Sequence, residues 1–151
     1  MRKLMLAILL AAAAETVALA CTCIPIPTDA AERQSIASDV ATGALALVEV
    51  ELVRAYDQVS GRGEGLRVVQ TIAGTAPTTF EAERARAPSS ASCDVEFRSG
   101  ERVMVLLYPP YVAGTGAEPR FRLADSCLSP LLSDQAFREA LIAAMARGER
   151  G

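Results

Sequence analysis

The distribution of apolar and polar residues predicts five strands. Three segments alternate apolar and charged side chains, as strands with one buried face do. A fourth contains the uninterrupted apolar run Val103-Met104-Val105-Leu106-Leu107, which is typical of a strand buried on both faces. Clusters of glycine, proline and serine separate the segments, as turns require. The expected strands cover residues 40–53, 66–72, 80–87, 101–108 and 120–123, with residues 80–87 expected at the surface.

Two helices are predicted, one before and one after the strands. The first is expected over residues 28–38, where Thr28 can cap its N-terminus. The second is expected to begin after Ser133, as its cap, and to end at Gly148. Its apolar stripe recurs every four residues and consists of Phe137, Leu141 and Met145. Together these elements predict a mainly β fold, a five-stranded Greek-key barrel of the OB type with a short N-terminal helix and a C-terminal helix.

The first twenty residues have the three-part pattern of a secretory signal. Two basic residues precede an apolar run at residues 4–14, and Ala18-Leu19-Ala20 provides a small-residue cleavage site. The run is shorter than the roughly 20 residues that a membrane-spanning helix needs. We therefore expect a signal peptide over residues 1–20 and a secreted or periplasmic domain over residues 21–151. A cysteine directly after the cut is also where lipoproteins are acylated, so a lipid anchor at Cys21 is the less favoured alternative.

Composition argues against several classes of function. The chain has no histidine, and its single lysine lies within the expected signal peptide. Serine or cysteine catalysis with a histidine base, histidine-ligated zinc and lysine Schiff bases are therefore excluded from the mature domain. Removing residues 1–20 changes the formal charge from −3 to −4, and a mildly acidic chain with dispersed arginines argues against a nucleic-acid partner. We expect a protein that is not an enzyme and has no cofactor.

The mature domain contains four cysteines, Cys21, Cys23, Cys93 and Cys127. An even number in an exported protein predicts two disulfides. A bond between Cys21 and Cys23 would close a very small, strained ring. Each of these two is therefore expected to pair with either Cys93 or Cys127, in one of two combinations. A four-cysteine zinc site is the less favoured alternative, because the last two cysteines are far apart in the sequence.

The N-terminal sequence Cys21-Thr22-Cys23, followed by Ile24-Pro25-Ile26-Pro27, resembles the N-terminus of the tissue inhibitors of metalloproteinases. Further segments resemble that family in the same order, namely residues 38–41, 92–97, 101–106 and 127–135. The resemblance spans nearly all of the mature chain. It implies a netrin-like domain, which is an OB barrel with flanking helices, in a single-domain, bacterial-type member. The third disulfide and the cysteine-rich second domain of the animal proteins are absent from this sequence.

The resemblance also implies the disulfides and the function. Cys21 would pair with Cys93, and Cys23 with Cys127. The free amine and carbonyl of Cys21 would bind the catalytic zinc of a target metalloprotease and displace its water. Thr22 would enter the first primed-side pocket of that protease. The protease-binding residues that the family implies are Cys21, Thr22, Cys23, Ile24, Pro25, Ser90, Ala91 and Ser92. The alternative is a cell-envelope interaction or scaffold module without protease inhibition.

Overall fold

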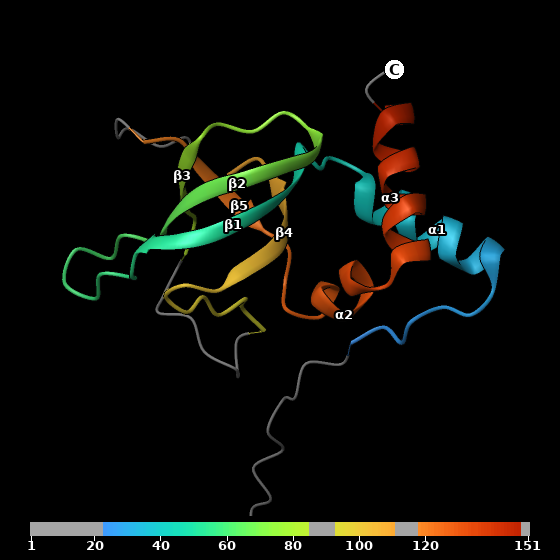
Figure 1. Cartoon of the computed structure of the whole chain (residues 1–151), viewed down its shortest axis with the longest axis horizontal. Coiled ribbons are helices and arrows are strands. Elements are labelled where there is room, and N and C mark those ends of the chain that lie inside the picture. The colour runs from blue at the N-terminus through green and yellow to red at the C-terminus, as the bar shows by residue number, and fades with distance from the viewer. Residues whose placement is uncertain (1–22, 85–92, 111–117, 149–151) are drawn as a thin grey trace, which may run out of the picture.

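The computed structural model describes residues 23–84, 93–110 and 118–148. Within these ranges the chain forms a closed barrel with helices packed on one side (Figure 1). The elements in chain order are α1 (Ala30–Ala41), β1 (Ala46–Arg54), β2 (Gly65–Gly74), β3 (Thr79–Ala82), β4 (Arg102–Tyr108), β5 (Arg120–Leu123), α2 (Leu128–Ser133) and α3 (Gln135–Gly148). The predicted mainly β fold with a five-stranded barrel of the OB type is confirmed.

The barrel closes through one parallel pair of strands. Its strand order is β1-β2-β3-β5-β4, and β4 pairs again with β1. The parallel pair is β3 with β5, in which Glu81 lies opposite Arg120 and Ala82 opposite Phe121. A parallel pair needs a long crossover connection, and here residues 83–119 form it, with β4 inside that stretch. The other four pairs are antiparallel.

The barrel interior is filled by alternate side chains of its strands. Ala46, Val48 and Val50 of β1 point inward, because successive side chains of a strand face opposite sides. Phe80 of β3 meets Phe121 of β5 edge to face, with ring centres 5.4 Å apart. The buried members of this interior cluster are Ala46, Val48, Val50, Leu66, Phe80, Ala82, Val95, Val105 and Leu107.

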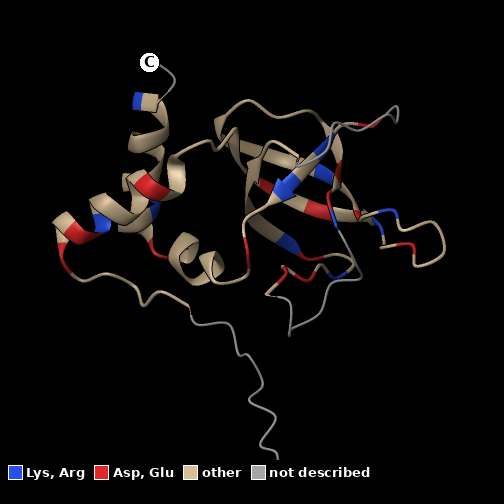
Figure 2. Ribbon diagram, turned by 180° about the vertical axis from the view of Figure 1, so that it is seen from behind, with Lys and Arg blue, Asp and Glu red and all other residues tan. Residues whose placement is uncertain are grey.

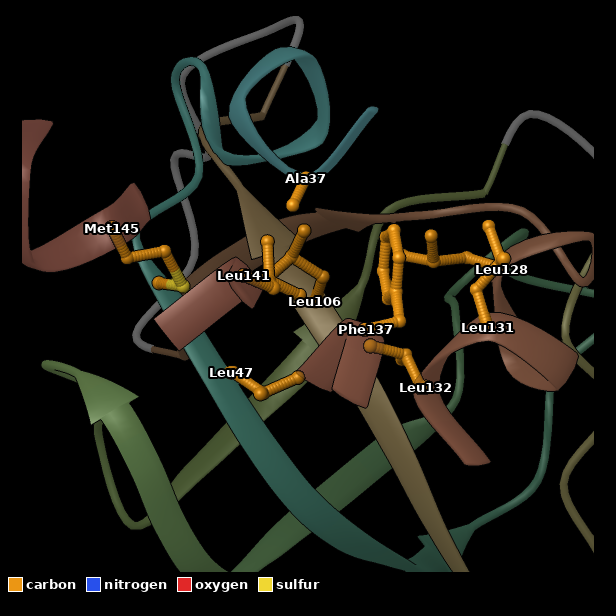
Figure 3. Packing of buried hydrophobic residues seen from close by; sticks show 9 residues of the cluster. All are labelled: Ala37, Leu47, Leu106, Leu128, Leu131, Leu132, Phe137, Leu141 and Met145. Carbon is orange, nitrogen blue, oxygen red and sulfur yellow. The ribbon is translucent and has the colours of Figure 1, made fainter. Parts of the chain in front are cut away.

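A second cluster fills the space between the barrel and the helices (Figure 3). Leu47 of β1 and Leu106 of β4 point outward from the barrel into it. Helix α3 supplies the predicted apolar stripe, which is confirmed as buried. Figure 3 shows these side chains converging on one another from the strands and from the helices. The buried members are Ala37, Leu47, Leu106, Leu128, Leu131, Leu132, Phe137, Leu141 and Met145.

The boundary between the first helix and the first strand differs from the prediction. Asp29, not Thr28, caps α1, since its carboxylate accepts hydrogen bonds from the amides of Ala31 and Glu32 at 2.8 and 3.0 Å. The hydrogen bonds from Glu32 and Ala31 lower the pKa of Asp29. The helix then continues past Ser38 to Ala41, so β1 begins at Ala46 and not at residue 40. The reason is packing: Val40 and Ala41 contact the cluster between barrel and helices.

The C-terminal part contains two helices where the sequence predicted one. The short helix α2 precedes α3, and Ser133 ends α2 instead of capping α3. Asp134 is the cap, because its carboxylate accepts a hydrogen bond from the Phe137 amide at 2.7 Å. Leu128, Leu131 and Leu132 make α2 stable by burying themselves in the cluster beneath it.

The third strand was also predicted incorrectly in extent and exposure. It ends at Ala82, and Phe80, Glu81 and Ala82 are buried instead of lying at the surface. The glutamate is buried because arginines surround its carboxylate, which a pattern of alternating charge does not reveal. Residues 85–87 of the expected strand lie outside the described residues.

Truncation of Phe137 to alanine is expected to destabilise the protein strongly. The side chain is completely buried at the centre of the cluster between barrel and helices. Phe137→Ala should lower the free energy of unfolding by about 3–5 kcal/mol, measured by urea denaturation. Val59→Ala is the matched control, because Val59 is 98% exposed and its loss should change stability by less than about 0.5 kcal/mol. Equal midpoints for the two variants would contradict this account of the cluster.

Candidate functional site

Residues 23–28 form an extended arm in front of α1. Prolines at positions 25 and 27 push the residues before them out of the helical conformation, so the arm cannot coil. The side chains of Ile24 and Ile26 are 52% and 47% exposed. Pro27 is buried, and its carbonyl accepts a hydrogen bond from the Arg33 guanidinium at 3.2 Å. The arm is therefore held where it joins α1 and presents apolar side chains to the outside.

A disulfide fixes the other end of the arm. It joins Cys23 to Cys127, the residue in front of α2, across a sequence separation of 104. Figure 1 shows the arm beginning close to α2. The Cys127 amide donates to the Asp125 carboxylate at 3.0 Å, which stabilises the turn that leads into the helix. The bond is the one that the family resemblance implied for these two cysteines. The four-cysteine zinc site is wrong, because Cys23 and Cys127 are bonded to each other.

The segment that begins at Cys93 lies against the same turn. The Ser126 amide donates to the Cys93 carbonyl at 2.8 Å, so Cys93 lies next to the Cys23–Cys127 bond. Cys93 is itself disulfide-bonded. Its expected partner, Cys21, lies outside the described residues, and so that pairing and the zinc-binding role of Cys21 stay predictions. The same holds for the protease contacts expected of Thr22, Ser90, Ala91 and Ser92.

Cys93 adopts a left-handed backbone conformation, with a φ of 57°. For a residue with a Cβ, steric contacts make this conformation less stable by about 1–2 kcal/mol. Neighbouring contacts must therefore hold the segment in place. On one side the Cys93 carbonyl is bound by Ser126, and on the other side Asp94 and Val95 are bound by an arginine from the barrel.

That arginine is Arg84, which the sequence analysis did not single out. Its side chain is 6% exposed, and its Nε donates to the Glu64 carboxylate at 2.9 Å. Its Nη1 lies 3.0 Å from the Asp94 carboxylate, and its Nη2 donates to the Val95 carbonyl at 2.7 Å. The guanidinium also lies 5.9 Å from the centre of the Phe97 ring. The sequence carries no local signal for this residue, because its partners come from 20 residues before it and from 10 or more after it.

A second charged cluster surrounds Glu81 in β3. Its carboxylate accepts hydrogen bonds from Arg54 and Arg62 at 3.0–3.1 Å and from the Gly63 amide at 3.3 Å. The two arginines also contact Glu118 at 3.1 Å. Gly63 must be glycine, since a Cβ there would lie 1.7 Å from a backbone oxygen of β3. Basic and acidic residues accordingly lie next to each other on the barrel (Figure 2). We assign this cluster to joining the strands and not to a ligand.

An open hollow of about 530 Å³ lies beside the arm and the disulfide. The Tyr108 hydroxyl at its wall donates to the Val40 carbonyl at 2.6 Å, and burial raises the pKa of this tyrosine. The Arg122 guanidinium lies 5.2 Å from the centre of the Tyr108 ring. The hollow extends the exposed surface of the arm towards α2, and its lining includes Ile24, Tyr108, Arg122, Asp125, Cys127 and Leu131.

The chain was also compared with known proteins. Across residues 23–84, 93–110 and 118–148, no three acidic or cysteine side chains group as a metal site. In the same ranges, none of the helices combines the length and the apolar composition that a membrane span requires. Comparisons with family models, with curated proteins and with solved structures found no match.

Proposed function

We propose that this protein is an exported inhibitor of zinc metalloproteases that binds through the free amine and carbonyl of Cys21. The observation that supports the proposal best is the convergence of three cysteine positions. Cys23 is bonded to Cys127, and Cys93 lies against the turn next to that bond. Residues 21 and 22, directly before Cys23 in the sequence, would then begin within reach of Cys93.

A chelating N-terminus needs an open coordination position on the target metal and a neutral amine. A catalytic zinc site supplies the first, because its fourth ligand is a water that can be displaced. The α-amine supplies the second, since its pKa of about 7.7–8.0 lets it lose a proton at little cost near neutral pH. The target zinc belongs to the protease, so the inhibitor itself requires no metal.

The arm is suited to binding because little of it must be ordered when a partner arrives. Each flexible side chain or loop that becomes fixed on association opposes binding, and an arm that is fixed beforehand avoids this cost. Here the disulfide fixes Cys23, two prolines stiffen the following residues, and the Pro27 carbonyl is bound by Arg33. The exposed Ile24 and Ile26 then offer apolar contact area beside the chelating residue.

A cell-envelope interaction or scaffold module is the second candidate. It is favoured by one observation, the cysteine that directly follows the expected cleavage site. In that case Cys21 would carry lipid on its thiol and on its amine, so it could neither bind zinc nor pair with Cys93. The intact mass of the exported protein distinguishes the two, because an acyl group at Cys21 contradicts the inhibitor and an unmodified N-terminus contradicts the lipid anchor.

Adding one alanine in front of Cys21 should abolish inhibition. The extra residue converts the amine of Cys21 into a peptide nitrogen, which does not bind zinc, and so destroys the ligand formed by the amine and the carbonyl. We expect the inhibition constant to rise at least about 100-fold, as the loss of a metal ligand implies, measured on a panel of zinc metalloproteases with a fluorogenic peptide. One alanine added after Gly151 is the matched control and should change nothing. The proposal fails if both extended proteins inhibit as strongly as the unextended protein does. It also fails if the unextended protein inhibits no protease in the panel.

Removing the disulfide of the arm should weaken inhibition without unfolding the barrel. The double variant Cys23→Ser, Cys127→Ser leaves both hydrophobic clusters intact, so its circular dichroism spectrum should match that of the natural protein. The arm is then held at its start only by the expected Cys21–Cys93 bond, so more of it must be ordered on binding, and we expect about tenfold weaker inhibition, measured well below the unfolding temperature. Undiminished inhibition by the folded double variant would show that the arm needs no fixing in advance.

A further inference from the structure

We propose that Arg84 is a positioning residue. Its side chain holds the segment that begins at Cys93 beside Cys127, next to the arm, independently of any disulfide. The importance of this role for inhibition rests on the function proposed above. The positioning itself rests on the contacts of Arg84 and can be measured without a protease.

The burial of Arg84 shows that its contacts are not incidental. The side chains of Arg84 and Glu64 are 6% and 5% exposed, so both charges have left water. Buried charges are tolerated when they are paired and hydrogen-bonded, and loss of one partner leaves the other uncompensated. Arg84 reaches two carboxylates and one carbonyl in different directions, which a planar guanidinium with five donors can do and a lysine ammonium cannot reproduce.

Arg84 and Glu64, which together form a clamp on the segment that begins at Cys93, are anchored on the barrel. Arg84 follows β3 by two residues, and Glu64 directly precedes β2. The Ala82 amide donates to the Glu64 carbonyl at 2.8 Å, and the Glu83 amide donates to the Phe121 carbonyl of β5 at 2.7 Å. Both sides of the Arg84–Glu64 pair are thus tied to the barrel, so the guanidinium presents a fixed site to the segment that it binds.

The segment it binds is part of the long crossover between β3 and β5. Asp94 and Val95 contact the guanidinium, and Cys93, directly before them, accepts the hydrogen bond from the Ser126 amide. Arg84 therefore fixes the position of Cys93 on one side, and Ser126 fixes it on the other. Without Arg84, the left-handed conformation of Cys93 would lose the contacts that hold the residues after it.

The Ser126 amide reports directly on this arrangement. Its hydrogen exchanges with solvent when the Cys93 carbonyl moves away. The Ala124 amide, two residues earlier, donates to the Leu106 carbonyl of β4 at 3.1 Å and does not depend on the Cys93 segment. A change confined to Ser126 thus measures loss of positioning, whereas general destabilisation accelerates both amides.

The test is amide hydrogen exchange by NMR on the full disulfide-bonded protein. Arg84→Met should accelerate exchange at Ser126 at least about tenfold and leave Ala124 unchanged. Arg67→Met is the matched control, because Arg67 pairs with Glu51 at an exposed position on β2, and it should affect neither amide. Arg84→Lys keeps the charge and should restore part of the protection.

Two results would overturn the proposal. One is unchanged exchange at Ser126 in Arg84→Met, and the other is equal acceleration at Ser126 and Ala124. If Arg84→Met does not fold, Asp94→Asn weakens the same clamp while leaving Glu64 paired, and the same two amides decide.

The protease assay separates this inference from the proposed function. If the natural protein inhibits a metalloprotease, the variant with accelerated Ser126 exchange should inhibit it more weakly, and Arg84→Lys should recover part of the loss. If the natural protein inhibits none, the proposed function fails while the exchange measurements still decide the positioning role. Full inhibition by a variant that has lost Ser126 protection would show that the site does not need the clamp.

Discussion

Burial of both faces of β1 holds the barrel and the helices together. Ala46 and Val48 fill the barrel interior, while Leu47 between them faces the helices. A strand that buries apolar side chains on both sides contributes to two clusters at once, so neither cluster can loosen without disturbing the other. The helices α1 and α3 therefore pack on one side of the barrel (Figure 1). Because the arm joins α1, its position at that end is fixed as well.

The elements that the sequence predicted well are those whose signal is local. The apolar run of β4 and the four-residue spacing of Phe137, Leu141 and Met145 each determine a structure within one segment. The boundary at Val40 was missed because valine and threonine favour strands, whereas packing of α1 against α3 keeps Val40 and Ala41 in the helix. The buried state of Glu81 was missed because its arginine partners lie on other strands and loops.

The candidate site likewise combines residues that the sequence indicates locally with residues that only the fold reveals. Its cysteines could be named from the sequence, because few other residues have so restricted a chemistry in an exported chain. Their convergence required the fold, which brings Cys93 to Ser126 through the crossover between β3 and β5. Arg84 could not be found at all from the sequence, since an arginine among several in residues 84–102 gives no sign of which one is buried.

The bond between Cys23 and Cys127 affects what happens when a peptide bond of the chain is cleaved. It closes a ring across a sequence separation of 104, and this ring contains β1 to β5. A peptide bond cut anywhere inside this ring leaves two pieces that are still joined covalently by the disulfide. The local concentration of the pieces remains high, so a nicked molecule can keep its shape. The ring therefore converts a cut that would otherwise separate the fragments into one after which they stay joined.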